Sequence, residues 1–414
     1  MRFAHMADLH IGAWRDQLLR DANLLAFLKA VDICTEKKVD FILISGDVFN
    51  TALPSLDPLK ETTKCLKELK DKKIPVYYIA GSHDYSPSGK TMLDVLERAG
   101  LIINAAKGTV NDKNELCLKF IIDPKTGAKI TGLPGRRGML DKKYYEVLDT
   151  YSLESEKGFK IFLFHTALDE LKPKALADMP SSPVSLLPKS FDYYAGGHVH
   201  IVDHVSLPGY NAIVYPGPLF PNSFREIEEL STGGFYIVDH DPVLDKIKCT
   251  FEPVQVFNTF SAKIDCTGFS PEECEKKLYE LIKRQEFMNT IVTLRLVGEL
   301  RSGRSSDINF KEIFSAVYDK SAFFVMKSTA LLTSKEFEEI KISEDGNANS
   351  DDVENALIAE HTGKNELPGF PASEESGLVK DLISALSVEK SDEEKVYDFE
   401  KRIIRDAAST FRLG

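Results

Sequence analysis

Aspartate and histidine side chains recur where short apolar segments of the chain end. Five motifs carry them, in chain order: Asp8-Leu9-His10, Gly46-Asp47, 81-GSHD-84, His165 and 196-GGHVH-200. Carboxylate oxygens and neutral imidazole nitrogens are ligands suited to Mn²⁺, Fe²⁺ or Zn²⁺. Two such ions held roughly 3.5–4 Å apart can lower the pKa of a bridging water and clamp a phosphate during in-line displacement. The residue types therefore predict metal-assisted cleavage of a phosphate ester.

Each motif alone has a simpler explanation. An Asp-x-His tripeptide is usually a solvated turn, two histidines one residue apart often only share a strand face, and a buried His165 could be satisfied by a backbone carbonyl. The joint pattern is more specific, because five of the nine histidines (10, 83, 165, 198 and 200) stand at these segment ends. His5 lies inside the first apolar segment and is expected in the core, and His204 is assigned no role.

The segments that precede these motifs have the pattern of buried strands. Three of them are short, apolar and followed by turn-forming residues: Phe3–Ala7, Phe41–Ser45 and Val76–Ala80. Residues 24–33 and 56–69 lie between them with apolar side chains at helical spacing, so a mainly parallel sheet covered by helices is predicted. Lys160–Phe164 and Phe191–Ala195 add two strands. Because carboxyl ends of parallel strands share one edge, the five motifs should converge in a single crevice.

The rest of the chain divides into regions of different pattern. Strands are predicted at 201–207, 212–216, 233–239 and 246–253, and then a strand–helix–strand–helix–strand order at 256–265, 271–284, 290–297, 309–318 and 322–326. A polar stretch and two amphipathic segments follow. We therefore expect a catalytic domain at 1–254, a small α+β cap domain at 255–333, an acidic linker at 334–370 and a helical tail at 371–414.

Composition limits the class of protein. The chain has 414 residues, and one domain per ~150 residues predicts two or three domains. No run of ~18 apolar residues could span a membrane, and the N-terminal residues argue against a signal peptide. Six scattered cysteines indicate reduced thiols of a cytosolic protein. Much of the net charge of −12 comes from residues 334–414, with 20 acidic and 10 basic side chains, so the nearly neutral remainder is compatible with local phosphate-binding patches.

One segment, 84-DYSPSGKT-91, has the outline of a phosphate-binding loop of nucleotide-binding proteins. The first glycine of that loop is replaced by Asp84, whose charge repels phosphate, and Pro87 removes a backbone donor. Nucleotide binding is therefore not expected there.

Taken in order, the five motifs resemble those of the calcineurin-like metallophosphoesterases, and most closely the SbcD-type DNA repair nucleases. The segments that carry the resemblance are 7-ADLHIGAW-14, 46-GDVFNTALPS-55, 195-AGGHVH-200 and 215-YPG-217. The resemblance implies an α/β fold: a metallophosphoesterase β-sandwich flanked by helices, with a small cap domain and a helical tail. It also implies a DNA nuclease that needs two divalent ions, Mn²⁺ in the first place, with Mg²⁺ or another ion as alternatives.

The same resemblance implies the roles of the site residues. Asp8, His10 and His200 would bind one ion, His165 and His198 the other, and Asp47 would bridge them. His83 would stabilise the transition state or protonate the leaving oxygen, with Asp84 orienting it. Ser82 stands where the family has an asparagine ligand, and a hydroxyl is the poorer ligand, so the second ion would be held more weakly or through a water. Asn50 stands where some relatives have histidine.

DNA contacts and partners follow less specifically. Candidate phosphate contacts are Arg15, Lys90, Arg136, Arg137 and Arg225 near the motifs and Arg301 and Arg304 in the cap domain. By analogy with the family we expect exonuclease action on duplex ends and endonuclease action on single strands or hairpins. We also expect a homodimer joined through residues 56–69 and 91–99, an SMC-like ABC ATPase of the SbcC type bound by residues 375–412, and a location in the prokaryotic cytoplasm or at the nucleoid.

Two other functions remain open from the sequence. A phosphomonoesterase or cyclic-nucleotide phosphodiesterase would use the same fold, although a small substrate needs neither a cap domain nor a tail. A weakly active DNA-binding scaffold is the second alternative, suggested by Ser82.

Overall fold

The computed structural model describes residues 1–414 except 87–88, 174–175, 177–178, 335–371, 389–395 and 411–414. The chain falls into two compact units, Met1–Ser334 and Lys335–Gly414. The acidic linker that we predict lies outside the described residues from Lys335 onward. Within the described part of the chain, every helix is too short or too polar to cross a membrane.

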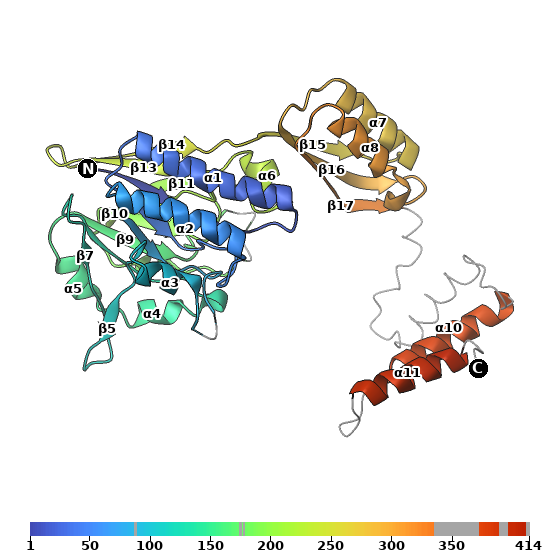
Figure 1. The fold of residues 1–414 in the computed structure, drawn as a ribbon, viewed down its shortest axis with the longest axis horizontal. Helices are drawn as coiled ribbons and strands as arrows, with labels where there is room; N and C mark the ends of the chain where they lie inside the picture. Colours follow the sequence, from blue (N-terminus) through green and yellow to red (C-terminus); the bar gives the residue numbers. More distant parts are fainter. Residues whose placement is uncertain (87–88, 174–175, 177–178, 335–371, 389–395, 411–414) are drawn as a thin grey trace. The chain divides into compact units, whose positions relative to one another are not determined.

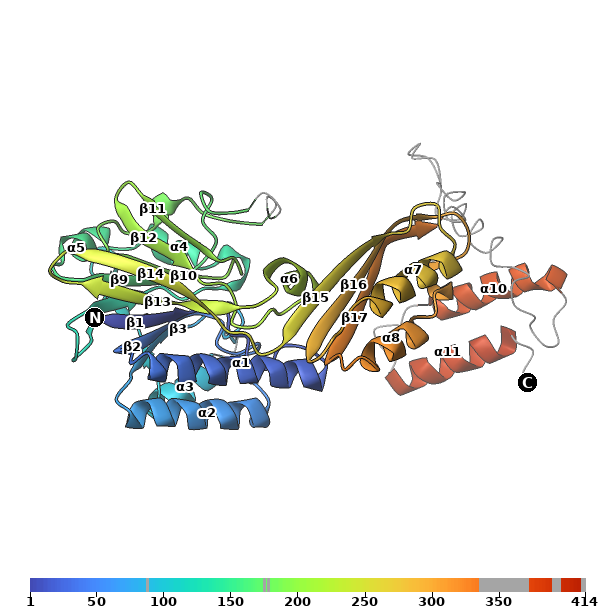
Figure 2. The same cartoon turned by 90° about the horizontal axis from the view of Figure 1, so that it is seen from above.

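Two six-stranded sheets form the centre of the first unit (Figure 1, Figure 2). In spatial order the first sheet consists of β14 (Lys246–Pro253), β13 (Gly234–Asp241), β1 (Arg2–Met6), β2 (Phe41–Ser45), β3 (Val76–Ile79) and β4 (Ile103–Asn104). The second consists of β11 (Asp203–Leu207), β12 (Tyr210–Tyr215), β10 (Tyr193–Gly197), β9 (Lys160–His165), β8 (Lys129–Gly132) and β7 (Ile121–Ile122). Neighbours run parallel from β1 to β4 and from β12 through β10 and β9 to β8, whereas the remaining pairs are antiparallel.

The two sheets bury a shared apolar core, as expected of a sandwich. Phe3 and Phe41 of the first sheet stack with ring centroids 4.9 Å apart, and Tyr193 of the second sheet meets Phe3 edge-on at 5.1 Å. Leu43 and Leu163, from the two sheets, belong to the same buried cluster. Strands buried on both faces must be apolar throughout, which explains why the sequence shows continuous rather than alternating hydrophobic runs.

Helices cover the outer faces of both sheets. The first sheet packs against α1 (Gln17–Glu36), α2 (Leu56–Asp71) and α3 (Met92–Arg98), and the second against α4 (Lys142–Glu146) and α5 (Thr150–Ser155). α1 extends beyond the predicted 24–33, because Asp16 caps it by accepting the N–H of Leu18 at 2.8 Å. A short hairpin, β5 (Gly108–Val110) and β6 (Leu116–Leu118), lies between the two sheets in sequence.

The β-sandwich that the resemblance implies is confirmed, whereas the single parallel sheet that the segment pattern alone predicted is wrong. The first three strands belong to one sheet and the fourth and fifth to another, so the crevice is shared between two sheets. The sequence also gave no sign of strands β4 to β8, which are only two to four residues long and carry too few side chains for a period to emerge.

The end of the first unit matches the predicted element order closely. A parallel three-stranded sheet, β15 (Asn258–Asp265), β16 (Thr290–Leu300) and β17 (Phe324–Ser334), packs against α7 (Pro271–Lys283) and α8 (Phe310–Tyr318) around its own buried cluster. We call residues 258–334 the cap sheet. Before it, α6 (Phe224–Leu230) connects β12 with β13, and the Arg295 side chain of β16 pairs with Glu228 of α6 at 2.7 Å.

The second unit contains α10 (Ala372–Leu386) and α11 (Val396–Thr410), which contact each other. Both were predicted from their amphipathic spacing. Leu378 is buried in this pair, while Leu386 and Ile404 remain exposed.

Candidate metal centre

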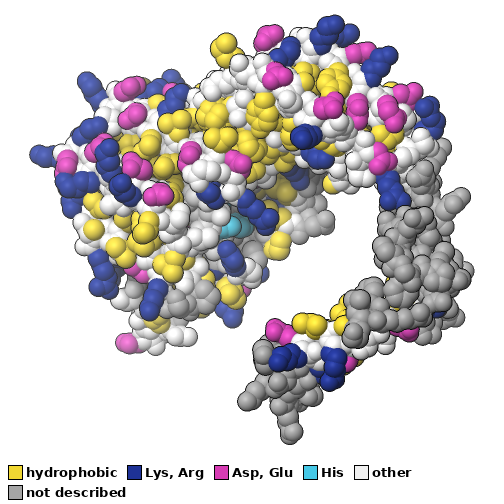
Figure 3. All heavy atoms as spheres, turned by 45° about the vertical axis from the view of Figure 1, so that its right-hand side comes forward, with side chains coloured by type: hydrophobic (Ala, Val, Ile, Leu, Met, Phe, Trp, Pro, Cys, Tyr) yellow, Lys and Arg dark blue, Asp and Glu magenta, His cyan; other side chains and the backbone are white. Residues whose placement is uncertain are grey.

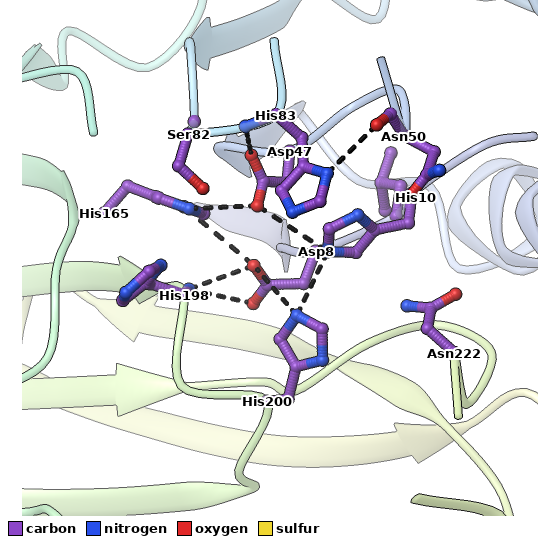
Figure 4. A network of polar contacts seen from close by, with 12 residues as sticks. Asp8, His10, Asp47, Asn50, Ser82, His83, His165, His198, His200 and Asn222 are labelled. Atoms are coloured by element: carbon purple, nitrogen blue, oxygen red, sulfur yellow. Dashed lines mark hydrogen bonds and ion pairs between the residues drawn. The ribbon is translucent and has the colours of Figure 1, made fainter. Parts of the chain in front are cut away.

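The five predicted motifs meet at the carboxyl ends of the central strands (Figure 4). Asp8 and His10 follow β1, Asp47 follows β2, His83 follows β3, His165 ends β9, and His198 and His200 follow β10. The sheets are tied together here, because the carboxylate of Asp8 accepts the backbone N–H of His198 at 3.0 Å. The N–H groups of Asp8 and His10 donate to the carbonyls of Gly46 and Asp47, at 3.1 and 2.9 Å, which joins the first two loops.

The backbone at this edge is strained. Five of the residues in the cluster have left-handed conformations, with φ of 52° at Asp8, 43° at His10, 51° at Asp47, 96° at His198 and 55° at His200. A non-glycine residue held in this region costs of order 1–3 kcal/mol, and such residues concentrate at functional sites. These left-handed conformations turn successive side chains of each loop toward the same point.

Glycines make room for the cluster. Gly46 has φ of 89°, and a Cβ there would lie 2.1 Å from Nδ1 of His165. A Cβ at Gly81 would lie 2.2 Å from Oδ1 of Asp47. Neither position could hold a larger residue without displacing a candidate ligand.

The side chains form overlapping groups of possible ligands. Within the described residues, ligand atoms lie within 4.8 Å of one another in three sets: Asp8, His10, His200; His10, Asp47, His83; and Asp8, Asp47, His165. The Nε2 atoms of His10 and His200 are 3.0 Å apart, and Nε2 of His165 is 3.2 Å from Oδ2 of Asp47. Asp47 belongs to two of the sets, as expected of a bridging carboxylate.

The donor set fits divalent cations. Nδ1 of His165 donates to the carbonyl of Ser45 at 2.8 Å, which leaves Nε2 without a proton in the neutral ring. Among the described residues this Nε2 is buried with no hydrogen-bond partner, and it faces the Asp47 carboxylate. A lone pair facing a carboxylate is repulsive unless a proton or a cation lies between them. The histidine and aspartate side chains therefore fit divalent cations held between them.

The pKa values show the same demand for positive charge. Burial lowers the pKa of His165, but the charge of Asp47 and the contact with it raise that pKa to about 10. Burial also lowers the pKa of His200, but the charges of Asp8 and Glu226 raise that pKa to about 9. Burial keeps His10 and His198 neutral, with pKa values of about 3 and 4. These shifts favour positive charge on His165 and His200, while burial raises the pKa of the Asp8 carboxyl.

His83 and Asp84 have different surroundings from those implied by the resemblance. Nδ1 of His83 donates to the backbone carbonyl of Asn50 at 3.0 Å, and the His83 N–H donates to Asp47 at 2.8 Å. The buried Asp84 carboxylate accepts backbone N–H groups of Val48, Phe49 and Gly81 at 3.0–3.1 Å. The Asn50 carbonyl therefore orients the His83 ring, while Asp84 joins the loops after β2 and β3.

Ser82 is 6% exposed, and its hydroxyl points toward the space between Asp47 and His165 (Figure 4). His5 lies outside the cluster, as predicted: its ring is buried and contacts the Tyr193 hydroxyl at 2.9 Å and the Ser45 hydroxyl at 3.1 Å. His204 is exposed.

Sequence reasoning missed Glu226. Its carboxylate lies 3.2 Å from Nδ1 of His200, where a carboxylate orients an imidazole and makes its other nitrogen a better ligand. The same carboxylate accepts the N–H of Asn222 at 2.8 Å, and Ser223 caps α6. The Ser223-x-x-Glu226 spacing is a helix-start signal, and it gives no indication of a contact with the site.

The residues predicted to contact DNA differ in their exposure and in the groups that they contact. Arg137 donates through Nε to the carbonyl of Ser82 at 3.2 Å, and the Arg136 guanidinium lies over two tyrosine rings. Arg15 and Lys90 are exposed on loops near the motifs. Arg225, Arg301 and Arg304 complete the predicted set; Arg225 pairs with Glu229 at 2.6 Å, and Arg301 with Glu273 at 3.0 Å in the cap sheet.

A hollow gives access to the centre. A cavity of about 510 Å³ opens beside His198 and His200 and is also lined by Arg225 and Glu226. Figure 3 shows a histidine side chain on the surface with lysine and arginine side chains near it. Apart from the two histidines, the acidic and basic side chains that line the cavity among the described residues are Arg225, Glu226 and Glu229.

Residues 1–202 match the family described as calcineurin-like phosphoesterase. The chain is 24% identical to the DNA double-strand break repair protein Mre11 of Archaeoglobus fulgidus over 95% of this chain and 91% of that protein. It is 29% identical to the protein of the same name from Methanococcus maripaludis, over 58% of this chain and 63% of that protein. For the one from Saccharolobus solfataricus the identity is 27%, over 76% of this chain and 78% of that protein.

Proposed function

Since residues 1–202 match the family described as calcineurin-like phosphoesterase, we propose that this chain is the metal-dependent DNA nuclease of a double-strand-break repair complex. The observation that carries the proposal is the convergence of two aspartates and five histidines from five strand ends at one buried edge. The similarity to DNA double-strand break repair proteins extends over 95% of the chain, well beyond the catalytic motifs. Hydrolysis of phosphodiester bonds in DNA would account for both the cluster and the similarity.

The ligand geometry supports a division of the site into two positions. Asp8, His10 and His200 would hold one ion, since their ligand atoms lie within 4.8 Å of one another. Asp47 would bridge to the second position, where His165 and His198 would bind with the weaker hydroxyl ligand of Ser82. We propose Mn²⁺ as the resident ion, because carboxylate and imidazole together suit it, with Mg²⁺ as the alternative. When bound, the pair of ions supplies an activated water and neutralises charge on the phosphate.

His83 would act on the leaving oxygen. Because the Asn50 carbonyl fixes Nδ1 as a donor, Nε2 is the nitrogen available to the substrate. Nε2 is therefore the atom that would serve as general acid toward the leaving oxygen. Asp84 maintains this geometry by holding the backbone of the adjoining loops.

DNA would contact basic side chains on both parts of the first unit. Arg15, Lys90 and Arg137 would contact phosphates on the catalytic domain, and Arg301 and Arg304 on the cap sheet. Such contacts position the strand without reading its sequence.

Further partners are proposed from apolar side chains that remain exposed. Leu56 of α2 is 79% exposed and Val95 of α3 is 56% exposed, which suits a homodimer joined through these helices. The exposed Leu386 and Ile404 of the tail helices suit docking onto an ABC-type ATPase of the SbcC kind. Such a complex would work on chromosomal DNA in the cytoplasm.

The decisive experiment is cleavage of end-labelled duplex and single-stranded DNA with Mn²⁺, with Mg²⁺ or without metal. Wild type is compared with His83→Ala, with and without the ATPase. Cleavage that requires metal and is lost in the variant is the expected result. His240→Ala is the matched control, because the His240 ring packs on Phe159 and pairs with Asp245 away from the cluster.

Two results would contradict the proposal. Hydrolysis of small phosphate esters without cleavage of any DNA would make the chain a phosphomonoesterase or a cyclic-nucleotide phosphodiesterase. Binding of metal and DNA without hydrolysis of either substrate would make it a scaffold, and Ser82→Asn would then be the substitution that tests whether the missing amide ligand is the cause.

A further inference from the structure

An arginine and two tyrosines form a compact cluster beside the metal centre. The guanidinium carbon of Arg136 lies 4.7 Å from the ring centroid of Tyr85 and 5.1 Å from that of Tyr144. A guanidinium over the face of an aromatic ring is attracted by the ring quadrupole, and Arg is the cation that stacks best because it is planar. We call Tyr85, Arg136 and Tyr144 the tyrosine–arginine cluster.

The cluster belongs to the loop that carries the catalytic histidine. Tyr85 follows His83 by two residues, and the intervening Asp84 is held by three backbone N–H groups. Arg137, the neighbour of Arg136, donates through Nε to the carbonyl of Ser82 at 3.2 Å. The two adjacent arginines therefore fix the loop on both sides of His83, and they fix the Tyr85 ring with it.

The Tyr85 ring is held in place and yet exposed. It is 39% exposed, whereas Tyr77, Tyr78, Tyr193 and Tyr194 are at most 2% exposed and serve the core. A core role therefore does not explain Tyr85. A rigid aromatic side chain at the surface loses little conformational entropy when it binds a flat apolar partner. Arg136 adds positive charge behind the ring, where the backbone phosphate of a nucleotide would approach.

We propose that Tyr85, supported by Arg136 and Tyr144, is a stacking platform for one unpaired nucleobase next to the cleaved phosphate. The inference rests on the proposed nuclease function and names the part of the substrate that the site recognises. Both faces of a base inside a duplex are covered by its neighbours, so the platform takes a base at a frayed end, in a hairpin loop or in a single strand. Stacking on an aromatic side chain is indifferent to sequence, as a repair nuclease requires.

The first test compares intact strands with strands that lack one base. A single abasic nucleotide is placed in turn at each position flanking the cleavage site of a labelled single-stranded oligonucleotide. For wild type, kcat/KM is expected to fall about tenfold at one position, since each stacked base contributes an effect of that order. Tyr85→Leu, which keeps bulk without a π face, is expected to lose about tenfold on the intact strand and nothing more on that abasic strand. Equal losses on both strands would overturn the proposal and leave Tyr85 a purely structural role.

The second test needs no metal and no cleavage. The fluorescent base 2-aminopurine is placed at the same position, and the strand is bound in the presence of a chelator, with binding followed by anisotropy. Quenching is expected for wild type and Tyr85→Phe, weaker quenching for Arg136→Lys, and none for Tyr85→Leu. Tyr151→Ala is the matched control, because Tyr151 of α5 is 81% exposed.

The two tests separate this inference from the proposed function. A protein that binds the strand without quenching 2-aminopurine at any position has no platform, whatever it cleaves. A protein that shows quenching but cleaves no DNA with any metal would retain the platform and lose the nuclease function.

Discussion

The metal centre and the cap sheet follow opposite rules, although both are built on parallel strands. At the metal centre Asp8, His10 and Asp47 have left-handed backbones and are buried. In the cap sheet the polar residues serve the helix ends. Ser270 forms a capping box with Glu273 at the start of α7, Pro271 occupies the first turn, and Asn309 caps α8.

The comparison distinguishes two kinds of residue. Those of the cap sheet stabilise the fold, whereas those of the metal centre have unfavourable conformations that the rest of the fold must offset. A capping box removes unsatisfied donors and favours folding, whereas buried like charges and strained φ angles oppose it. Natural proteins break local rules mainly at functional sites and compensate elsewhere. Variants at the metal centre should therefore abolish activity, and variants in the cap sheet should lower stability without changing the chemistry.

The largest effect is expected from Asp47→Asn. The amide keeps an oxygen for the His83 N–H, which Asp47 accepts at 2.8 Å, but removes the charge that would bridge the ions. DNA cleavage should fall to the level of the metal-free protein, on the order of 10⁴-fold or more. Calorimetric titration with Mn²⁺ should show the loss of at least one binding event.

Asp47→Asn also gives a prediction about the thermal stability of the protein. Without metal at neutral pH, Asp47→Asn should unfold at a lower temperature than wild type, because the protonated His165 loses the carboxylate that faces it at 3.2 Å. This loss should disappear above pH 10, where the His165 imidazole is neutral; a loss that persisted there would place Asp47 among the residues that hold the fold, contrary to the comparison. Asp265→Asn is the matched control in the cap sheet, where the exposed Asp265 carboxylate accepts the N–H of Thr267 at 2.9 Å; cleavage and metal binding should not change.

The next largest effect is expected from His83→Gln. Removal of a general acid typically costs a factor on the order of 10²–10⁴ in rate. Metal binding should persist, because the proposed ligand set does not include His83. Single-turnover cleavage and calorimetry on the same preparation check both points. A variant that loses metal along with activity would show that His83 is a ligand, as its place beside His10 and Asp47 allows.

The contrast also explains how far the sequence could be interpreted. The convergence of six side chains could be predicted because each stands where an apolar run ends: Asp8, His10, Asp47, His165, His198 and His200. The orientation of His83 by Asn50 could not be predicted, since the acceptor is a backbone carbonyl and a residue of any type carries one. Tyr85 had no signal either, because its contact with Arg136 joins loops that are far apart in the sequence.

The cap sheet was predicted almost element by element, for the opposite reason. Its helices begin at sequence signals such as Ser270-Pro271, and its strands are long enough for their pattern to emerge. The catalytic sandwich is harder, because its division into two sheets depends on packing between strands that are all apolar.

A smaller effect is expected from pH. In the metal-free protein the pKa values of His165 and His200 are about 10 and 9, above the ordinary 6.5, so both imidazoles are protonated at neutral pH. Their contribution to stability is complete below pH 6.5 and is lost as the pH rises through 9 to 10. Cations must displace these protons, so metal affinity should increase with pH by up to about tenfold per unit for each proton released.

Calorimetry in buffers of different ionisation enthalpy measures that release directly. At least one proton per protein is expected at pH 7.5. No release would mean that the carboxylates are already balanced by another route, and the proposed ligand nitrogens would be wrong. The cap sheet should behave differently, because metal should not alter the pH dependence of stability that its exposed carboxylates produce.

The smallest effect is expected from Ser270→Ala. The Ser270 hydroxyl accepts the N–H of Glu273, whose carboxylate in turn accepts the N–H of Ser270 at 2.8 Å. Loss of an N-cap side chain costs typically about 1 kcal/mol, which lowers the melting temperature by a few degrees in a domain of this size. Metal binding and the cleavage of short single strands should be unchanged, because Ser270 contacts only the start of α7. If Ser270→Ala weakened metal binding, the division between the two regions would fail, and the cap sheet would have to be regarded as part of the metal centre.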